Sequence, residues 1–405
     1  MTLPLEGVRV LDLTRALAGP FCTMILADMG ADVIKVEPVG TGEMIRGWGP
    51  FSEGISVYYL SVNRNKRSLA LDMRAPEGRA LLRRMALDSD VVVENFRPGT
   101  MEGMGLGWDG LRAENPRLVL TSVTGFGRDG PYGPWPGFDQ IAQGMSGMMS
   151  LTGTPDTGPM RYGVPIGDLV ASMWAAIGTL SAIVQRTATG QGQRVETSLL
   201  SGLVALLCVQ GQRYLSLDEV PPQVGNEHPV ICPYGAYRAA DGPINVAAAT
   251  PQMWRSLCDL LGMPEIADHA DFAENAARMR NRDRLRAMIE ERLAGATRQE
   301  WTERMIAAGI PAGPIYDLAE VFDDPQVRHC GMVEQIAHPV IGQLAQMAGA
   351  VRLEGHGTAM VRRPPPMLGE HSREVLADYG LPEGDIARLL AAGTIGDWDR
   401  GAGDA

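Results

Sequence analysis

Short apolar runs alternate with amphipathic stretches over the first 125 residues of the chain. The apolar runs predict buried strands, and the stretches between them predict helices over residues 19–30 and 76–88. Pro20 suits the first turn of the earlier helix. Strands that alternate with helices form βαβ units, so the pattern indicates an open parallel sheet whose ligands bind at the carboxyl ends of its strands. These strands are predicted over residues 8–13, 31–37, 90–96 and 117–125.

Helical periodicity is strongest after Asp168. Loop chemistry with three prolines occupies residues 125–137, and helices are predicted over 140–151 and from Leu169 onward. We expect the second of these to be a long buried helix. Its expected core-facing row recurs with a 3.6-residue period and consists of Val170, Met173, Trp174, Ile177 and Val184. A short strand near Val195 and a helical stretch over residues 199–215 follow.

The pattern changes near residue 222. Residues 225–248 predict a small hairpin with a turn at Asp241-Gly242, and charged helices follow over residues 251–308. Beyond residue 326 the apolar and turn-rich pattern of the first part returns. We therefore predict a large α/β domain over residues 1–221, a smaller α+β domain over 222–325, and a segment over 326–405 that completes the large domain.

Composition narrows the function classes. The 405 residues carry a net charge of −12, which argues against nucleic acid or an anionic membrane as the main partner. No basic-then-apolar leader and no uninterrupted run of 18 apolar residues is present, so we expect a cytoplasmic protein without a membrane span. The five cysteines are scattered and never spaced as CxxC, which is typical of reduced thiols and indicates neither a disulfide framework nor a zinc site.

Asp168 is the first candidate for chemistry, because it stands where the long helix begins. The positive end of a helix favours an ionised carboxylate, and an ionised carboxylate can act as a nucleophile. The structural alternative is simple capping, since aspartate is a common N-cap residue.

Two basic clusters are candidates for binding an anion. The first is a polar turn over residues 63–67, which holds Arg64, Lys66 and Arg67. The second is Asn95-Phe96-Arg97-Pro98-Gly99 at the end of the strand DVVVENF, where Arg97 could donate to a phosphate and Phe96 could present a ring face. In each case the alternative is a solvated surface turn, and the position at a strand's carboxyl end favours ligand contact for the second cluster.

Three other motifs fail on context. GFGRDG at residues 125–130 satisfies GxGxxG, but prolines rather than a helix follow it, so a dinucleotide site is not expected. The sequence around Ser146 lacks the last glycine of a nucleophile elbow. The six histidines show no metal-ligand spacing, so we expect neither a metal centre nor a histidine-based triad.

Several strings in the same order along nearly the whole chain resemble the class III coenzyme A transferases, the formyl-CoA and carnitine-CoA transferase type, also called the CaiB/BaiF family. These strings are LEGVRVLDLTRALAGP, GADVIKVEP, NRNKRSLALDM, ENFRPG, GMGLGW, GDL at Asp168, TGQGQ, PYGAY, ADG and PPPMLGEH. The resemblance implies a Rossmann-like large domain with a smaller second domain. It also implies an interlaced homodimer whose active site combines two chains.

The resemblance also implies a reaction. Asp168 would attack an acyl-CoA to give an aspartyl anhydride, then an aspartyl-CoA thioester, with backbone amides beside Gly167 as possible oxyanion donors and no metal or redox cofactor. The acids that it implies are short dicarboxylates such as succinate or glutarate. Arg46 or Arg161 could pair with the distal carboxylate of such an acid, and the alternative is that each is a solvated loop arginine. CoA would be held by Leu17, Ala18, Leu71, Asp72, Met73, Arg74, Asn95, Phe96 and Arg97.

Two alternative functions remain open, and the sequence departs from that of some relatives at two positions. An α-methylacyl-CoA racemase shares the implied fold, but its GHD motif is Gly137-Phe138-Asp139 here, so the second base of a proton exchange is missing. A non-catalytic acyl-CoA binding protein is the other alternative. Pro38 and Thr124 stand where some relatives have basic residues, so the contacts at the nucleotide end of CoA differ from theirs.

Overall fold

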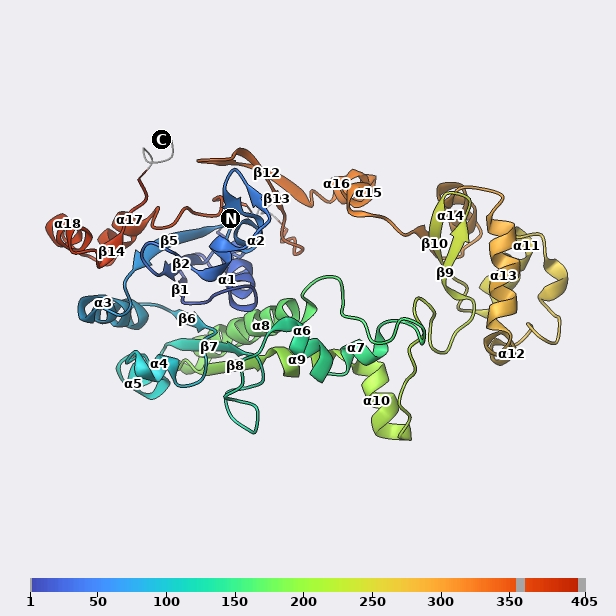
Figure 1. Cartoon of the computed structure of the whole chain (residues 1–405), viewed down its shortest axis with the longest axis horizontal. Coiled ribbons are helices and arrows are strands. Elements are labelled where there is room, and N and C mark those ends of the chain that lie inside the picture. The colour runs from blue at the N-terminus through green and yellow to red at the C-terminus, as the bar shows by residue number, and fades with distance from the viewer. Residues whose placement is uncertain (1, 355–360, 400–405) are drawn as a thin grey trace. The chain divides into compact units, whose positions relative to one another are not determined.

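The computed structural model describes residues 2–354 and 361–399, so parts of the predicted segment 326–405 lie outside the described residues. The chain divides into two compact units (Figure 1). The first comprises Met1–Met149, Arg161–Val220 and Gln326–Ala405, and the second comprises Ser150–Met160 and Pro221–Pro325. Residues 150–160 thus belong to the second unit, whereas the sequence pattern places them in the large domain.

A seven-stranded sheet forms the centre of the first unit. All neighbouring strands are parallel except β14, which pairs antiparallel with β5 through Ile395 opposite Leu71. The predicted α/β class with a parallel sheet is therefore confirmed. The strand order is β14 (Ile395–Gly396), β5 (Lys66–Leu71), β2 (Asp32–Glu37), β1 (Arg9–Asp12), β6 (Val91–Glu94), β7 (Val119–Thr124) and β8 (Arg194–Ser198).

Helices cover both faces of this sheet and form two separate cores. Leucines and methionines of α3, α5, α17 and α18 pack on one face, and alanine-rich surfaces of α1 and α8 pack on the other. The helices of the first unit are α1 (Ala18–Asp28), η1 (Met44–Gly47), α2 (Val57–Val62), α3 (Pro76–Leu87), α4 (Thr100–Gly103), α5 (Trp108–Glu114), α6 (Asp139–Met145), α7 (Met148–Leu151, which ends in the second unit), α8 (Ile166–Thr189), α9 (Leu199–Leu206), α10 (Cys208–Leu217), α16 (Pro325–His329), α17 (Ser372–Asp378) and α18 (Glu383–Ala391). Its hairpins are β3 (Phe51–Ser52) with β4 (Ile55–Ser56) and β12 (Val333–His338) with β13 (Gly342–Met347).

Helix α8 is long, as predicted, and begins at Ile166 instead of Leu169, but the prediction of its buried face is wrong. Val170 is buried, whereas Met173, Trp174, Ile177 and Val184 are 44–68% exposed. The face against β7, β8 and α1 consists of small residues such as Ala171, Ala175, Ala176 and Ala182, because small side chains let a helix approach its neighbours closely. The large apolar row therefore points away from the core of its own unit.

One described helix, α8, is long and apolar enough to cross a membrane by length and composition, and 44% of its most apolar window is buried in the protein. Near its C-terminal end, buried Arg186 pairs with Asp90 at 3.0 Å. This packing is typical of the core helix of an α/β sheet.

The C-terminal residues complete the edge of the large sheet. The Ser68 hydroxyl on β5 accepts a hydrogen bond from the Gly369 amide at 3.0 Å, and the Asp72 amide donates to Thr394 O at 2.8 Å.

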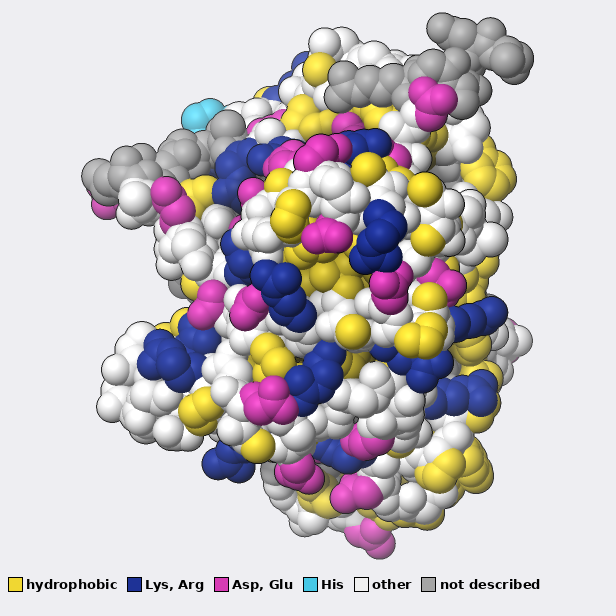
Figure 2. Space-filling view, turned by 90° about the vertical axis from the view of Figure 1, so that its left-hand side faces the viewer, with side chains coloured by type: hydrophobic (Ala, Val, Ile, Leu, Met, Phe, Trp, Pro, Cys, Tyr) yellow, Lys and Arg dark blue, Asp and Glu magenta, His cyan; other side chains and the backbone are white. Residues whose placement is uncertain are grey.

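Arginines and carboxylates are interspersed on the face shown in Figure 2, without a broad positive surface there. Ion pairs between exposed side chains of the first unit include Arg388 with Glu77 and Arg83 with Glu114.

The second unit has its own small sheet and its own core. Its three strands pair antiparallel in the order β11 (Ala312–Pro314), β10 (Gly242–Ala247) and β9 (Tyr234–Ala239). The turn of the predicted hairpin lies at Ala240-Asp241, one residue earlier than predicted, because Gly242 already pairs with Ala239. Trp254, Phe272 and Trp301 are buried in the core beneath it. Its helices are α11 (Pro251–Leu260), η2 (Pro264–Ile266), α12 (Asn275–Arg280), α13 (Arg282–Leu293), α14 (Arg298–Ala307) and α15 (Leu318–Asp323).

Candidate active site

The loops that follow the parallel strands gather at one edge of the large sheet. The chain reverses its direction of progress between β1 and β6, since β2 and β5 lie on one side of β1 while β6 and β7 lie on the other. Open α/β sheets bind ligands in the crevice at such a switch point. Two cavities lie at this edge, lined by residues that follow β1, β2, β5, β6 and β7.

The first cavity has a volume of about 700 Å³ and contains the candidate nucleophile. Asp168 lines it together with Leu17, Ala18 and the turn Asn95–Arg97. The second cavity, of about 1050 Å³, is lined by Leu71, Asp72, Met73 and Arg74. Asp168 and all the residues that the resemblance implies for CoA binding therefore line one of the two cavities.

Arg15 and Met44 line both cavities, which places the two next to each other. Sequence reasoning did not select Arg15 as a binding residue. The signal was available, because Arg15 is the basic residue that follows the first predicted strand, three positions beyond the last residue of β1.

Asp168 is the third residue of α8 and is not its cap. The N-cap position is Pro165, and no side chain caps the helix there. The capping alternative is therefore wrong, and the carboxyl group lines the cavity instead.

Burial and the nearby charge of Asp139 raise the pKa of Asp168 from 3.8 to about 7. This is the opposite of the direction expected from the helix N-terminus alone, because desolvation and a like charge outweigh the helix dipole. Asp168 is thus a more basic carboxylate than an ordinary aspartate and titrates near neutral pH.

The Asp139 carboxylate accepts a hydrogen bond from a backbone amide that was expected to serve as an oxyanion donor. The Gly167 amide donates to Asp139 Oδ1 at 2.7 Å, so this donor is already used in the described structure. Gln143 Nε2 donates to Asp139 Oδ2 at 2.7 Å, and the Tyr162 amide donates to Gln143 Oε1 at 2.8 Å. These bonds attach the segment that precedes α8 to α6.

The loop after β1 is fixed against the Asn95 turn and against α8. The Asn95 side chain accepts from the Arg15 amide at 2.9 Å and donates to Arg15 O at 2.8 Å. The Ser172 hydroxyl lies 2.5 Å from Ala18 O and 2.6 Å from Asp168 O. The two predicted binding segments and the first turn of α8 are therefore connected by direct contacts.

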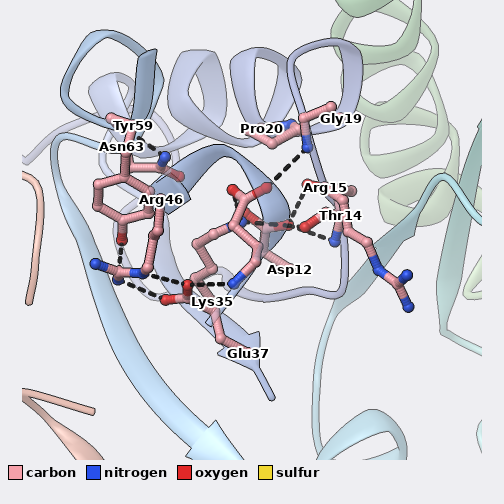
Figure 3. Close-up of polar contacts among 12 residues, drawn as sticks. Asp12, Thr14, Arg15, Gly19, Pro20, Lys35, Glu37, Arg46, Tyr59 and Asn63 are labelled. Atoms are coloured by element: carbon pink, nitrogen blue, oxygen red, sulfur yellow. Dashed lines mark hydrogen bonds and ion pairs between the residues drawn. The ribbon is translucent and has the colours of Figure 1, made fainter. Parts of the chain in front are cut away.

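A buried network of charges supports this loop from below (Figure 3). Lys35 Nζ lies 2.9 Å from Glu43 Oε1 and 3.1 Å from Thr14 O, and Glu43 Oε2 accepts from the Ala16 amide at 2.8 Å. The carboxylate of Asp12 accepts from the Thr14 amide at 2.9 Å. Burial opposes ionisation of Asp12, but the nearby lysines and threonines hold its pKa well below its usual value. The network thus fixes the backbone of residues 14–16 from inside the protein.

The basic turn over residues 63–67 belongs to the protein interior, so its interpretation as a ligand site is wrong. Arg64 pairs with Asp28 at 2.6 Å, Lys66 with Asp12 at 3.0 Å, and Arg67 with carboxylates that include Asp32 at 2.6 Å. All three cations are buried, and ion pairs with carboxylates of the same unit compensate for the water that each has lost.

Two further expectations are corrected by the geometry. Arg46 cannot reach a substrate carboxylate, because it donates to Glu37 at 2.6 and 2.8 Å and to the Tyr59 hydroxyl at 2.6 Å. Phe96 is buried, and the guanidinium of Arg15 lies 4.6 Å from the centre of its ring, so the ring does not offer that face to an adenine. Arg161 does line the first cavity and is exposed.

The GFGRDG motif forms part of the wall of the first cavity. No helix follows it until α6 begins at Asp139, as the prolines after the motif predict. A Cβ added to Gly125 would lie 2.6 Å from the Cα atom of Gly137. The two glycines therefore allow the loop before α6 to pass directly over the end of β7.

Comparison with known proteins decides the family. The sequence model of CoA-transferase family III matches residues 5–372. The chain belongs to this family. It is therefore a CoA-transferase, an enzyme that moves CoA from an acyl-CoA donor to a carboxylic acid acceptor.

Individual relatives of this CoA-transferase match over most of their length. The succinyl-CoA:glutarate CoA-transferase of Mus musculus is 39% identical over 394 residues, which are 97% of this chain and 90% of the relative. The succinate–glutarate CoA-transferase of Agrobacterium fabrum is 38% identical and covers 93% of this chain and 95% of its own. The crystal structure of a CaiB/BaiF family protein from Brucella suis has a TM-score of 0.84 and 37% identity, and covers 93% of this chain and 100% of its own.

Proposed function

We propose that this enzyme transfers CoA between short dicarboxylic acids and that Asp168 carries the group covalently. One observation supports this above the others: the Asp168 carboxyl group lines a cavity that also contains the Asn95 turn and adjoins a second cavity. A thioester bound along these two cavities could present its reacting carbonyl to this carboxylate.

The proposed reaction has four steps. An Asp168 oxygen attacks the thioester carbonyl, a C–O bond forms, the C–S bond breaks, and CoA leaves as a thiolate. The thiolate then attacks the side-chain carbonyl of the anhydride, so a C–S bond forms and the donor acid leaves as a carboxylate. The acceptor carboxylate attacks the aspartyl-CoA thioester to give a second anhydride and a thiolate. The thiolate finally attacks the acyl group and releases Asp168.

The raised pKa of Asp168 suits this sequence. A carboxylate with a pKa of about 7 is more basic than an ordinary aspartate, and nucleophilicity rises with basicity within one class of nucleophile. At pH 7 about half of the side chains still carry the charge that attack requires. Exclusion of water matters equally, because water would hydrolyse an aspartyl anhydride.

We assign the two cavities to different parts of the substrate. Arg15, Arg74 and Arg97 supply cations for the phosphates of CoA around the second cavity and its junction with the first. The Asn95 side chain holds the loop between the two cavities, because it hydrogen-bonds to the backbone of Arg15. Leu71 borders the second cavity but is fully buried, so we assign it to the packing of the wall.

The acceptor class follows from relatives and from one cation. The Mus musculus and Agrobacterium relatives bear names that specify succinate and glutarate, and another relative, from Chloroflexus aurantiacus, is a succinyl-CoA–D-citramalate CoA-transferase. All of these acids carry a second carboxylate. Arg161 lines the same cavity as Asp168, and we assign it to that distal carboxylate.

The racemase alternative lacks a second proton-transfer group. Phe138 occupies the position of the histidine, lines the cavity and is 58% exposed. Its ring cannot accept or donate a proton, so a two-base exchange has no second base at this position.

We also propose a homodimer in the cytoplasm. Met173, Trp174 and Ile177 on α8 leave a row of large apolar side chains open to solvent in one chain, and α9 and α10 continue it with Val204, Val209 and Leu215. An exposed apolar row of this extent is typical of a protein–protein interface. Ile177→Asp should therefore produce monomers in size-exclusion chromatography with light scattering, and an unchanged mass would contradict the proposed interface.

The test of the mechanism is trapping of the intermediate. Wild-type enzyme incubated with succinyl-CoA and then hydroxylamine should carry a hydroxamate at Asp168, detectable by intact-protein and peptide mass spectrometry. Asp168→Ala should show no adduct and no transfer to glutarate, yet should still bind CoA in a calorimeter. An adduct on the Asp168→Ala protein, or transfer activity in it, would overturn the assignment.

A further inference from the structure

Asp139 lies in the active cavity without an assigned role in the proposed chemistry. It is the first residue of α6, it is buried to 9% exposure, and it lines the same cavity as Asp168. Both of its oxygens accept hydrogen bonds at 2.7 Å, one from the Gly167 amide and one from Gln143 Nε2. Acceptance at both oxygens is the pattern of an ionised carboxylate.

The contact with α8 depends on a glycine beside the nucleophile. A Cβ added to Gly167 would lie 2.9 Å from Asp139 Oδ1 and 3.2 Å from Leu203 Cδ1. A larger residue would therefore displace the Asp139 carboxylate from the helix. Because Gly167 directly precedes Asp168, the same bond fixes the position of the nucleophile's backbone.

Asp139 is also the charge that acts on Asp168. Besides burial, its like charge is the cause of the raised pKa of Asp168. Around α8, helix α9 and strand β7 carry no ionisable side chain. Other ionisable groups around α8 are Arg194 and Glu196 on β8, which pair with each other, Cys22 and Asp28 on α1, of which Asp28 pairs with Arg64, and Arg186 on α8 itself, which pairs with Asp90. The cavity lining adds Tyr58, Arg15, Arg97 and Arg161.

We propose that Asp139 is a positioning residue for the nucleophile, which holds the first turn of α8 and maintains a negative charge that favours the acylated, neutral state of Asp168. This inference rests on the proposed function of Asp168. When Asp168 forms an anhydride or a thioester, its negative charge is transferred to the departing thiolate or carboxylate. Repulsion between the two aspartates then disappears, so the covalent states gain stability relative to the free carboxylate.

The test separates charge from hydrogen bonding. Asp139→Asn keeps an oxygen that can accept from the Gly167 amide but removes the charge. We expect the acidic limb of the pH profile of kcat/KM to move to lower pH by about one unit. We expect the fraction of enzyme trapped as aspartyl-CoA thioester, measured by intact-protein mass spectrometry with succinyl-CoA, to fall about tenfold.

Gln143→Leu is the matched control, because it removes a hydrogen bond to Asp139 and leaves its charge in place. This variant should lower kcat but keep the acidic limb where it is in the wild type. An unmoved limb in Asp139→Asn, or an equal shift in both variants, would overturn the inference while leaving the nucleophile assignment intact. An adduct in Asp168→Ala would instead refute the proposed function, so the two failures are distinguishable.

Discussion

Replacement of Asp168 with asparagine should make the protein more stable, although it should abolish transfer. The aspartate has a pKa of about 7 in the folded protein and an ordinary value of 3.8. The folded protein therefore binds this proton more tightly than the unfolded chain does. Ionisation of Asp168 costs folding free energy at every pH where the unfolded chain has already lost the proton.

The size of the effect follows from the difference between the two pKa values. The step from 3.8 to about 7 corresponds to about 4 kcal/mol, at about 1.4 kcal/mol for each pH unit. The side chain lines an open cavity, and solvent there screens part of the cost, so we expect about 2 kcal/mol. Asparagine has the same shape and does not titrate, so it escapes this penalty.

The assay is urea denaturation of both proteins between pH 4 and pH 8. The gain in the free energy of unfolding should be close to zero at pH 4, rise as the pH passes toward 7, and stay constant above it. Asp129→Asn, the same substitution at an exposed loop residue, is the matched control. A stability difference that does not vary with pH would refute the reasoning, because it would arise from packing rather than from the charge of Asp168.

Three further predictions test other parts of the site. Arg97→Ala should raise the KM for acyl-CoA between 10-fold and 100-fold, as roughly expected for loss of one charged hydrogen bond, with little change in the KM for the acceptor. Arg161→Gln should raise the KM for glutarate about tenfold but not that for butyrate, and equal effects on both acids in steady-state assays would argue against its contact with the distal carboxylate. Lys66→Met should lower the free energy of unfolding by about 3–5 kcal/mol in urea, because it leaves the Asp12 carboxylate buried without its ion-pair partner. The double variant Asp12→Asn with Lys66→Met should recover part of this loss, and a double variant no more stable than the single one would contradict the ion-pair account.

The order of the strands and helices in the first 200 residues was largely predictable, because each element has its own local pattern. Strand β5 was missed, since its first residues Lys66, Arg67 and Ser68 are polar although all are buried. Strand β14 has only two residues and carries no pattern of its own. Both lie where charges or edge pairing, rather than apolar periodicity, determine the structure.

Partners that lie far away in the sequence also explain why the sequence could not distinguish the buried basic cluster from the one at the cavity. Arginine and lysine next to asparagine have the same appearance in a sequence, whether carboxylates or solvent surround them. Asp28 and Asp32, which pair with Arg64 and Arg67, lie more than 30 residues earlier in the chain. The turn at Asn95, for which ligand contact was predicted, lines a cavity; it directly follows a strand, and the end of a strand is a local feature.

Helix α8 shows what periodicity can and cannot determine. A row of large apolar residues predicts a helix, but it does not determine which face of that helix packs on the sheet. The alanines opposite this row pack on the sheet because only small side chains allow a close approach, and the row with Trp174 and Ile177 remains open. The length of a helix is a local property, whereas its buried face depends on how many surfaces the assembled protein offers.

The reactivity of Asp168 is the least local property of the site. Its position in the first turn of a helix predicted an acidic carboxylate, and that argument considered only α8. Asp139 bonds to Gly167 across 28 residues of sequence, and its charge with burial reverses the direction of the pKa shift. A helix dipole acts with about half a charge that solvent screens, whereas a buried carboxylate acts with a whole one. The place of Asp168 in the chain therefore marks it as a candidate nucleophile, whereas the pKa of its carboxyl group depends on a neighbour that only the fold brings to it.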